Sequence, residues 1–158
     1  MQEGIQKYVQ SSKSKSLLIA TVAGLLGTLA FDAVMYIDIA ITGIPLDVPK
    51  VLGGLLVGQN GHIDLVGHTF HFLNGIALAL FYDLIFLRVS TKVLRSHMWL
   101  HGIIFAMLVT VMPLWLGLLP VLGAGIAGAN ISPLVSVITI VRHIAFGIVL
   151  GLMVKGSN

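Results

Sequence analysis

The chain has 158 residues, of which 57% are apolar and 9% are charged, and its mean hydropathy is +1.02. Soluble domains carry about 25% charged residues, so this composition excludes an ordinary soluble globule, a disordered chain and a nucleic-acid-binding domain. The sequence is that of an integral membrane protein. Because the chain has no Cys, disulfides, thiolate metal sites and cysteine nucleophiles are excluded as well.

Four apolar runs have the length of about 20 residues that a helix needs to cross roughly 30 Å of hydrocarbon. They lie at about 17–42, 64–87, 98–119 and 133–154. We therefore predict an all-α fold, a polytopic four-helix membrane bundle that forms a single domain over residues 1–158 and begins with a polar segment, 1–16. The first run is too long for a cleaved leader and carries two aspartates, so we expect a retained anchor. Pro113 is expected to kink the third run.

Positive charge is unevenly distributed among the connections. Most Lys and Arg residues lie before the first run, between the second and third, and after the fourth: Lys7, Lys13, Lys15, Arg88, Lys92, Arg95 and Lys155. The other two connections carry only Lys50. By the positive-inside rule, both termini are expected on the cytoplasmic side of the cell membrane.

The outer connection between the first two runs has its own helix signals. Asp47 is suited to cap a helix and Pro49 to begin one. The apolar stretch that follows, 51–57, is too short to span the bilayer. We expect a short interfacial or re-entrant helix here.

Small and ionisable residues recur at a spacing of four, which places them on one helix face. Gly24 and Asp32 share such a face, and so do His143 and Gly147. Small residues allow close helix packing and ionisable side chains avoid lipid, so these faces are predicted to point inward.

Arg142 falls near the middle of the fourth span, where a guanidinium keeps its charge and needs an acceptor. Asp32 is the preferred partner by depth and face, and Asp38 is the second choice. We interpret the pair as an ionic contact that locks the first span against the fourth, in preference to a proton or substrate pathway.

The histidines suggest a second kind of site. His68 and His71 share a face of the second span, and His143 lies at comparable depth in the fourth. With Asp38 or Asp32 as a further ligand, these imidazoles would suit a haem b iron or a divalent metal.

A separate group lies at the cytoplasmic end and consists of Asp83, His97 and His101. Two imidazoles and a carboxylate would suit a metal. The basic residues and Trp99 nearby are more typical of an ordinary interfacial anchor.

No enzyme motif is found: the sequence lacks a Gly-rich phosphate loop, His-Glu-x-x-His and Gly-x-Ser-x-Gly, and its single Glu is Glu3. We therefore favour a non-catalytic accessory or structural subunit of a larger membrane complex of the respiratory or oxidase type. One alternative is a histidine-ligated haem or metal protein in electron transfer, and another is transport of a proton, cation or small solute. The expected partners are the lipid bilayer and other membrane subunits or further copies of the chain, and no nucleic acid.

One part of the chain resembles a known family. The residues that carry the resemblance are Gly43-Ile44-Pro45-Leu46-Asp47-Val48-Pro49-Lys50, then Leu52-Gly53, Gly67-His68, His71-Phe72 and Asn74-Gly75. They resemble a family of small four-span prokaryotic membrane proteins of unknown function, over the first span, the outer loop and the second span. The resemblance implies the four-span architecture and draws attention to the Pro-rich loop and the second-span histidines, but it implies no activity.

Overall fold

The computed structural model describes residues 2–58, 61–89 and 97–154, with side chains from Gln10 onward. Helices are the regular elements of these residues. They are α1 (Gln2–Thr42), α2 (Val48–Val57), α3 (Ile63–Phe81), α4 (Leu87–Val89), α5 (Met98–Phe105), α6 (Leu119–Val121) and α7 (Leu134–Met153), with π-helical segments η2 (Tyr82–Phe86), η4 (Ala106–Val111) and η5 (Leu114–Leu118) and a 3₁₀ turn η6 (Ile126–Gly128).

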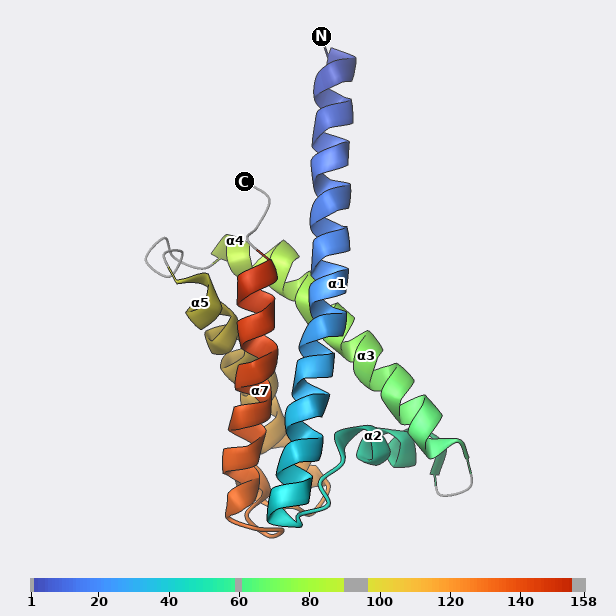
Figure 1. Ribbon diagram of the computed structural model, residues 1–158, viewed down its shortest axis with the longest axis vertical. Helices are drawn as coiled ribbons and strands as arrows, with labels where there is room; N and C mark the ends of the chain where they lie inside the picture. Colours follow the sequence, from blue (N-terminus) through green and yellow to red (C-terminus); the bar gives the residue numbers. More distant parts are fainter. Residues whose placement is uncertain (1, 59–60, 90–96, 155–158) are drawn as a thin grey trace.

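Four continuous helical stretches are long and apolar enough to cross a membrane. They are Gln10–Thr42, Ile63–Val89, Met98–Val121 and Leu134–Met153. The predicted all-α fold with four spans is confirmed, although α1 runs back without a break to Gln2. The start of α1 and the end of α7 lie at the same end of the molecule (Figure 1).

The spans form an open row instead of a closed ring. α1 packs on both α3 and α7, and α5 packs on the other side of α7. α3 leans away from the remaining spans toward α2 (Figure 1). Within the described residues, the second and third spans meet where Phe81 and η2 pack against α5. No contact of similar extent joins α3 to η4 or η5 in this part of the chain.

Glycines allow the close crossings of this row. A Cβ on Gly24 of α1 would lie 2.7 Å from the carbonyl oxygen of Gly75 in α3. A Cβ on Gly147 of α7 would lie 2.7 Å from the carbonyl oxygen of Gly102 in α5. Real Cβ atoms do not approach a backbone oxygen this closely, so both crossings require a residue without a side chain.

The short helix expected between the first and second spans is α2. An Asp47 carboxylate oxygen accepts a hydrogen bond from the backbone N–H of Lys50 at 3.0 Å, and Pro49 occupies the first turn. Both features match the sequence signals for a helix start. α2 crosses the beginning of α3, where a Cβ on Gly67 would collide with the backbone of Pro49.

The third span departs from regular α-helix on both sides of Pro113, where η4 precedes the proline and η5 follows it. Proline has no N–H to donate to the preceding turn, and π-helical turns are one way in which a helix accommodates such an interruption. The break expected at Pro113 thus takes the form of a changed hydrogen-bond pattern.

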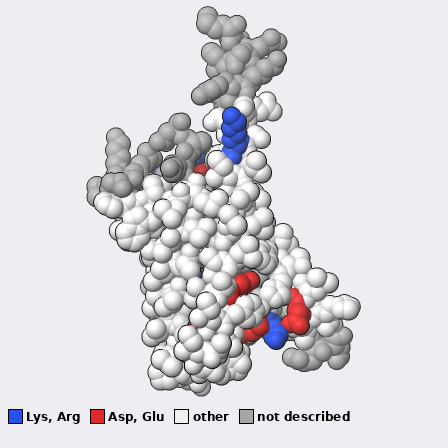
Figure 2. Space-filling model, in the orientation of Figure 1, with Lys and Arg blue, Asp and Glu red and all other residues white. Residues whose placement is uncertain are grey.

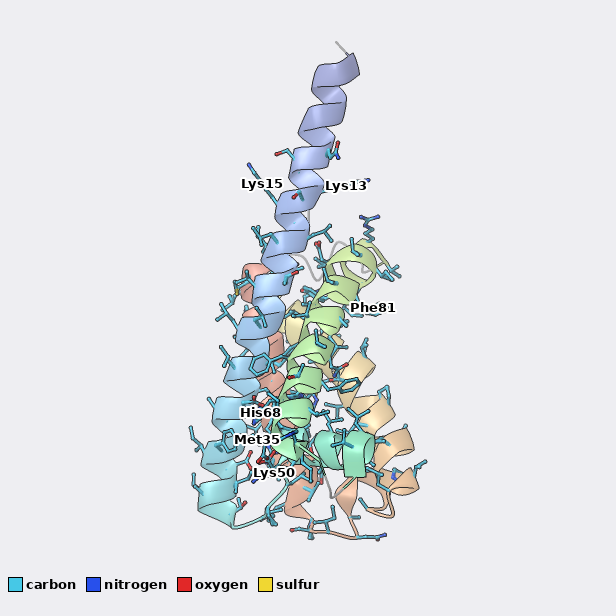
Figure 3. All side chains as sticks on the ribbon, turned by 90° about the vertical axis from the view of Figure 1, so that its right-hand side faces the viewer. Lys13, Lys15, Met35, Lys50, His68 and Phe81 are labelled. Carbon is cyan, nitrogen blue, oxygen red and sulfur yellow. The ribbon has the colours of Figure 1, made fainter. Side chains whose placement is uncertain are left out.

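On the face shown in Figure 2, blue atoms lie on the upper projection and red and blue atoms lie in the lower third, with a broad white area between them. Lys13 and Lys15 lie on the part of α1 that extends beyond the other spans, whereas Lys50 lies near the opposite end (Figure 3). An uncharged middle with charges at the ends is the distribution that a bilayer requires.

Candidate functional site

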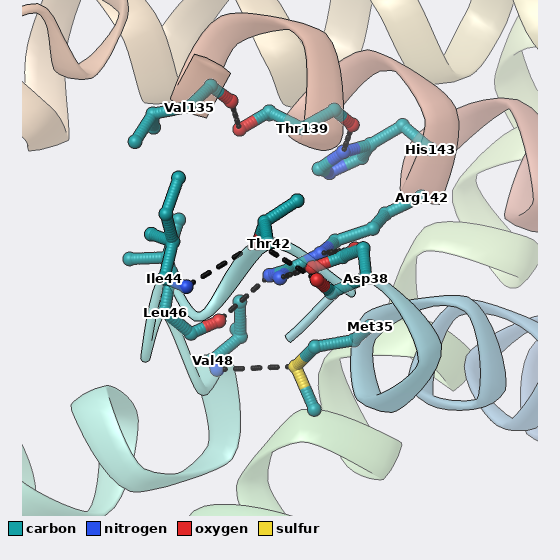
Figure 4. Close-up of polar contacts among 10 residues, drawn as sticks. All are labelled: Met35, Asp38, Thr42, Ile44, Leu46, Val48, Val135, Thr139, Arg142 and His143. Carbon is teal, nitrogen blue, oxygen red and sulfur yellow. Dashed lines mark hydrogen bonds and ion pairs between the residues drawn. The ribbon is translucent and has the colours of Figure 1, made fainter. Parts of the chain in front are cut away.

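Arg142 is the largest fully buried side chain of the described residues, with 1% of its surface exposed. Its Nε and Nη2 donate to the two carboxylate oxygens of Asp38 at 2.6 and 2.5 Å, and its Nη1 donates to the backbone carbonyl of Leu46 at 2.7 Å (Figure 4). The two parallel bonds to one carboxylate form the bidentate geometry that suits a guanidinium. The contact ties α7 to both α1 and the loop before α2.

The preferred sequence assignment, an Asp32–Arg142 pair, is therefore wrong, and the second choice, Asp38, is the partner. The Asp32–Arg142 pairing was predicted from the depths of the two residues along their helices, without the length of the Arg side chain. The long Arg side chain extends from α7 to the loop carbonyl of Leu46, so its charged end lies toward the end of the bundle where α1 ends. Asp38 is the acidic residue of α1 at that level.

Asp32 instead belongs to a polar array between α1 and α3. One of its carboxylate oxygens lies 3.1 Å from Nε2 of His71, and the other lies 3.9 Å from Nδ1 of His68. Nε2 of His68 lies 3.3 Å from the hydroxyl of Tyr36. The array runs from the exposed Tyr36 to the buried His71.

Phe31 links the histidines of two spans. Its ring meets the imidazoles of His71 and His143 edge-on, with centroid separations of 5.1 and 5.0 Å. Nδ1 of His143 donates to the backbone carbonyl of Thr139 at 2.7 Å (Figure 4). Because a carbonyl only accepts, Nδ1 carries the hydrogen, and Nε2 of a neutral ring keeps its lone pair.

These groups border a cavity of about 360 Å³ enclosed by all four spans, α2 and the loop before it. Most of its lining is apolar. The polar lining residues are Thr28, His71, Asn74, Thr110, Thr139, Arg142 and His143. The volume falls within the range of about 300–1,000 Å³ that is typical of small-molecule sites.

Part of the cavity lining is exposed at the surface of the molecule. The lining residues that are themselves exposed include Val51 of α2, Asn74 of α3, and Pro113 and Leu118 of the third span. Two of these three elements belong to helical stretches that are apolar enough to span a membrane.

The haem or metal candidates are distributed over different contacts. His71 and His143 line the cavity, whereas Asp38 is engaged by Arg142 and His68 is half exposed beside Tyr36. Within residues 2–58, 61–89 and 97–154, no group of three or more His, Cys, Asp or Glu side chains is arranged to hold a metal ion.

The candidates at the opposite end also have separate surroundings. Asp83 accepts a hydrogen bond from Ser16 of α1 at 2.5 Å. Nδ1 of His101 lies 2.9 Å from the hydroxyl of Tyr82, and its ring packs edge-on against the rings of Tyr82 and Phe86. His97 is exposed at the start of α5.

Two parts of the site were missed by reasoning from the sequence. The carbonyl of Leu46 is a backbone group, which no residue type reveals. Phe31 precedes Asp32 and reads as one more apolar residue of a membrane helix. The histidines at 71 and 143 were found because ionisable residues inside a span are rare.

The fold and the buried polar groups define a small helical membrane protein with four spans. Residues 14–157 match a family of unknown function, DUF6789, and the chain belongs to this family. The resemblance noted in the outer loop and second span, to small membrane proteins of unknown function, is thereby confirmed. No curated protein and no solved structure matches the chain.

Proposed function

We propose that this protein binds a small lipophilic molecule that enters its cavity from the bilayer. The observation that carries the proposal is the cavity of about 360 Å³, with a mostly apolar lining and a few polar side chains, including His71, Asn74 and His143. Pockets of this composition bind molecules with an apolar body and use a few polar groups to orient them.

The open row of spans supports entry from the membrane. Exposed lining residues lie on α2, α3 and the third span, and entry between α3 and the third span would let a molecule dissolved in lipid reach the cavity without crossing water. Binding through such an opening leaves the packing of α1 on α7 undisturbed, because the opening lies elsewhere.

The test uses the neighbouring residues Val109 and Leu108 of the third span. Val109 lines the cavity, whereas Leu108 is 56% exposed on the outer surface. The full-length protein is purified from its native membrane in mild detergent, and bound small molecules are detected by native mass spectrometry and solvent extraction. Val109→Trp should lose a molecule that the wild type retains, because the indole occupies the cavity.

Leu108→Trp is the matched control, since it adds the same side chain one residue away on the lipid side. It should retain the molecule at the wild-type level. A wild-type protein that retains no small molecule, or a Val109→Trp variant that retains it unchanged, would contradict the proposal.

The role of an accessory subunit in a respiratory or oxidase-type complex stays a prediction, as does assembly into a homo-oligomer. Exposed apolar side chains such as Leu65 and Leu116 fit lipid as well as a partner helix. The same purification tests both, because a stoichiometric protein partner or a larger mass would be seen directly.

The haem, metal and transport hypotheses also stay predictions. A haem would be visible as a Soret band in the purified protein, and a metal by elemental analysis. Transport along Asp32, Asn74 and Arg142 would be measured as flux into proteoliposomes.

A further inference from the structure

We infer that the molecule bound in the cavity carries a hydroxyl group, and that this hydroxyl donates a hydrogen bond to His71. The inference rests on the proposed function and specifies the class of ligand. Its basis is an unsatisfied hydrogen-bond acceptor on a buried side chain that lines the cavity.

His71 is 8% exposed and lines the cavity. Its Nε2 lies 3.1 Å from a carboxylate oxygen of Asp32, at an angle outside that of a well-formed hydrogen bond. Its Nδ1 has no hydrogen-bond partner among the described residues. A buried polar atom without a partner is uncommon in proteins and calls for an explanation such as a bound group.

The carboxylate determines what kind of partner is missing. An ionised carboxylate accepts hydrogen bonds and donates none, so a neutral His71 ring places its hydrogen on Nε2, toward Asp32. Nδ1 is then an acceptor. The molecule that satisfies it must supply a donor.

His143 leads to the same requirement independently. Its Nδ1 donates to the carbonyl of Thr139, which leaves Nε2 as an acceptor on a second side chain that lines the same cavity. Both imidazoles therefore favour a ligand with donor hydrogens over one that only accepts.

The charges near the cavity favour a neutral donor. An ammonium group would lose its hydration in a mostly apolar cavity. The guanidinium of Arg142 is already engaged by the carboxylate of Asp38 through two bonds, and Asp32 adds a second negative charge beside His71, so an added carboxylate would meet two acids and a single neutralised Arg. A lipophilic alcohol or phenol meets neither difficulty.

The test compares two molecules that differ in one hydrogen-bond donor, 4-nonylphenol and its methyl ether, 4-nonylanisole. Each is added at the same mole fraction of lipid to nanodiscs that hold the full-length protein, and occupancy is measured by native mass spectrometry. The ether leaves the buried acceptor unsatisfied, which is costly, so the phenol should bind about tenfold more tightly than the ether.

Variants assign the preference to one atom. His71→Phe keeps a ring of similar size and removes the acceptor, so both probes should bind with a ratio near one. His68→Phe alters a half-exposed imidazole of the same helix that does not belong to the lining, and it should keep the wild-type ratio. Decanoic acid and decylamine, compared with decanol, test an acidic and a basic head group against a hydroxyl on the same chain.

Failure of this inference is distinguishable from failure of the proposed function. Equal binding of phenol and ether to the wild type, or tighter binding of the acid or amine than of decanol, would overturn the hydroxyl assignment while the cavity remained a binding site. Absence of binding by all five probes would overturn both. The wild-type comparison needs no variant, so a His71→Phe protein that fails to fold does not affect it.

Discussion

Arg142 belongs to a helix that is long and apolar enough to cross the membrane, and its guanidinium donates hydrogen bonds to one carboxylate and one backbone carbonyl. Breaking a buried pair by removal of one partner leaves an uncompensated charge, which costs about 3–5 kcal/mol. Replacing both partners by apolar residues avoids that cost. The contribution of the pair is therefore best measured through variants on both sides.

We expect Asp38→Leu to lower the free energy of unfolding in detergent by about 3–5 kcal/mol. The double variant Asp38→Leu with Arg142→Met should recover most of this loss, because no unpaired charge is left. Unfolding of the two single variants and the double variant, followed by circular dichroism, gives the coupling energy.

The matched control couples Arg142→Met with Asp32→Leu. Asp32 faces His71 and not Arg142, so this pair of changes should show little coupling and the losses should add. Strong coupling to Asp32 and none to Asp38 would show that the pairing in the structure is wrong.

At the scale of single residues, the sequence was informative about which side chains matter and less so about which ones meet. The cost of charge in lipid singled out Arg142, Asp32 and Asp38. Their pairing depends on the direction and reach of a long side chain, which residue spacing does not specify. The same holds for Phe31, whose place beside two imidazoles depends on how three helices cross.

At the scale of the helices, the close crossing of α5 and α7 requires a residue without a side chain at Gly102. A Cβ on Gly102 would collide with the backbone of Gly147 and Gly151. We expect Gly102→Val to separate the two helices and to lower the thermal unfolding midpoint in detergent, with a loss of at least the roughly 1–3 kcal/mol that is typical of overpacking.

Gly117 provides the control in the same span. A Cβ there would meet no atom within 4 Å, so Gly117→Val should leave the unfolding midpoint nearly unchanged. Equal effects at the two glycines would indicate that the close crossing of α5 and α7 does not stabilise the fold.

The positions of the helices were predicted better than any other feature of the structure. Long apolar runs identified all four spans, and the pair Asp47 and Pro49 identified α2, because capping and hydrophobicity are local properties of the chain. The π-helical segments η2, η4 and η5 were not foreseen apart from the interruption at Pro113. They depend on how each span fits its neighbours, and so does the wide separation of α3 from the third span.

For the molecule as a whole, the orientation in the membrane stays a prediction from charge. The chain has no Cys, so a single introduced thiol is unique. Lys13 and Lys50 are both exposed and lie toward opposite ends (Figure 3). In intact cells a membrane-impermeant maleimide should label Lys50→Cys, whereas Lys13→Cys should react only after permeabilisation.

The reverse labelling pattern would place both termini outside. Labelling of both thiols in intact cells would show either a mixed orientation or leakage, which a cytoplasmic control protein distinguishes.

The length of α1 has a consequence for how the molecule moves. Its 41 residues extend over about 61 Å at 1.5 Å per residue, about twice the thickness of the hydrocarbon layer. The polar residues at the start of α1 are continuous with the apolar run that follows, with no glycine or proline between Gln10 and Ala23. A group attached near Gln10 would therefore rotate together with the whole protein. Its height above the headgroups and its direction relative to the proposed entrance of the cavity would both stay fixed.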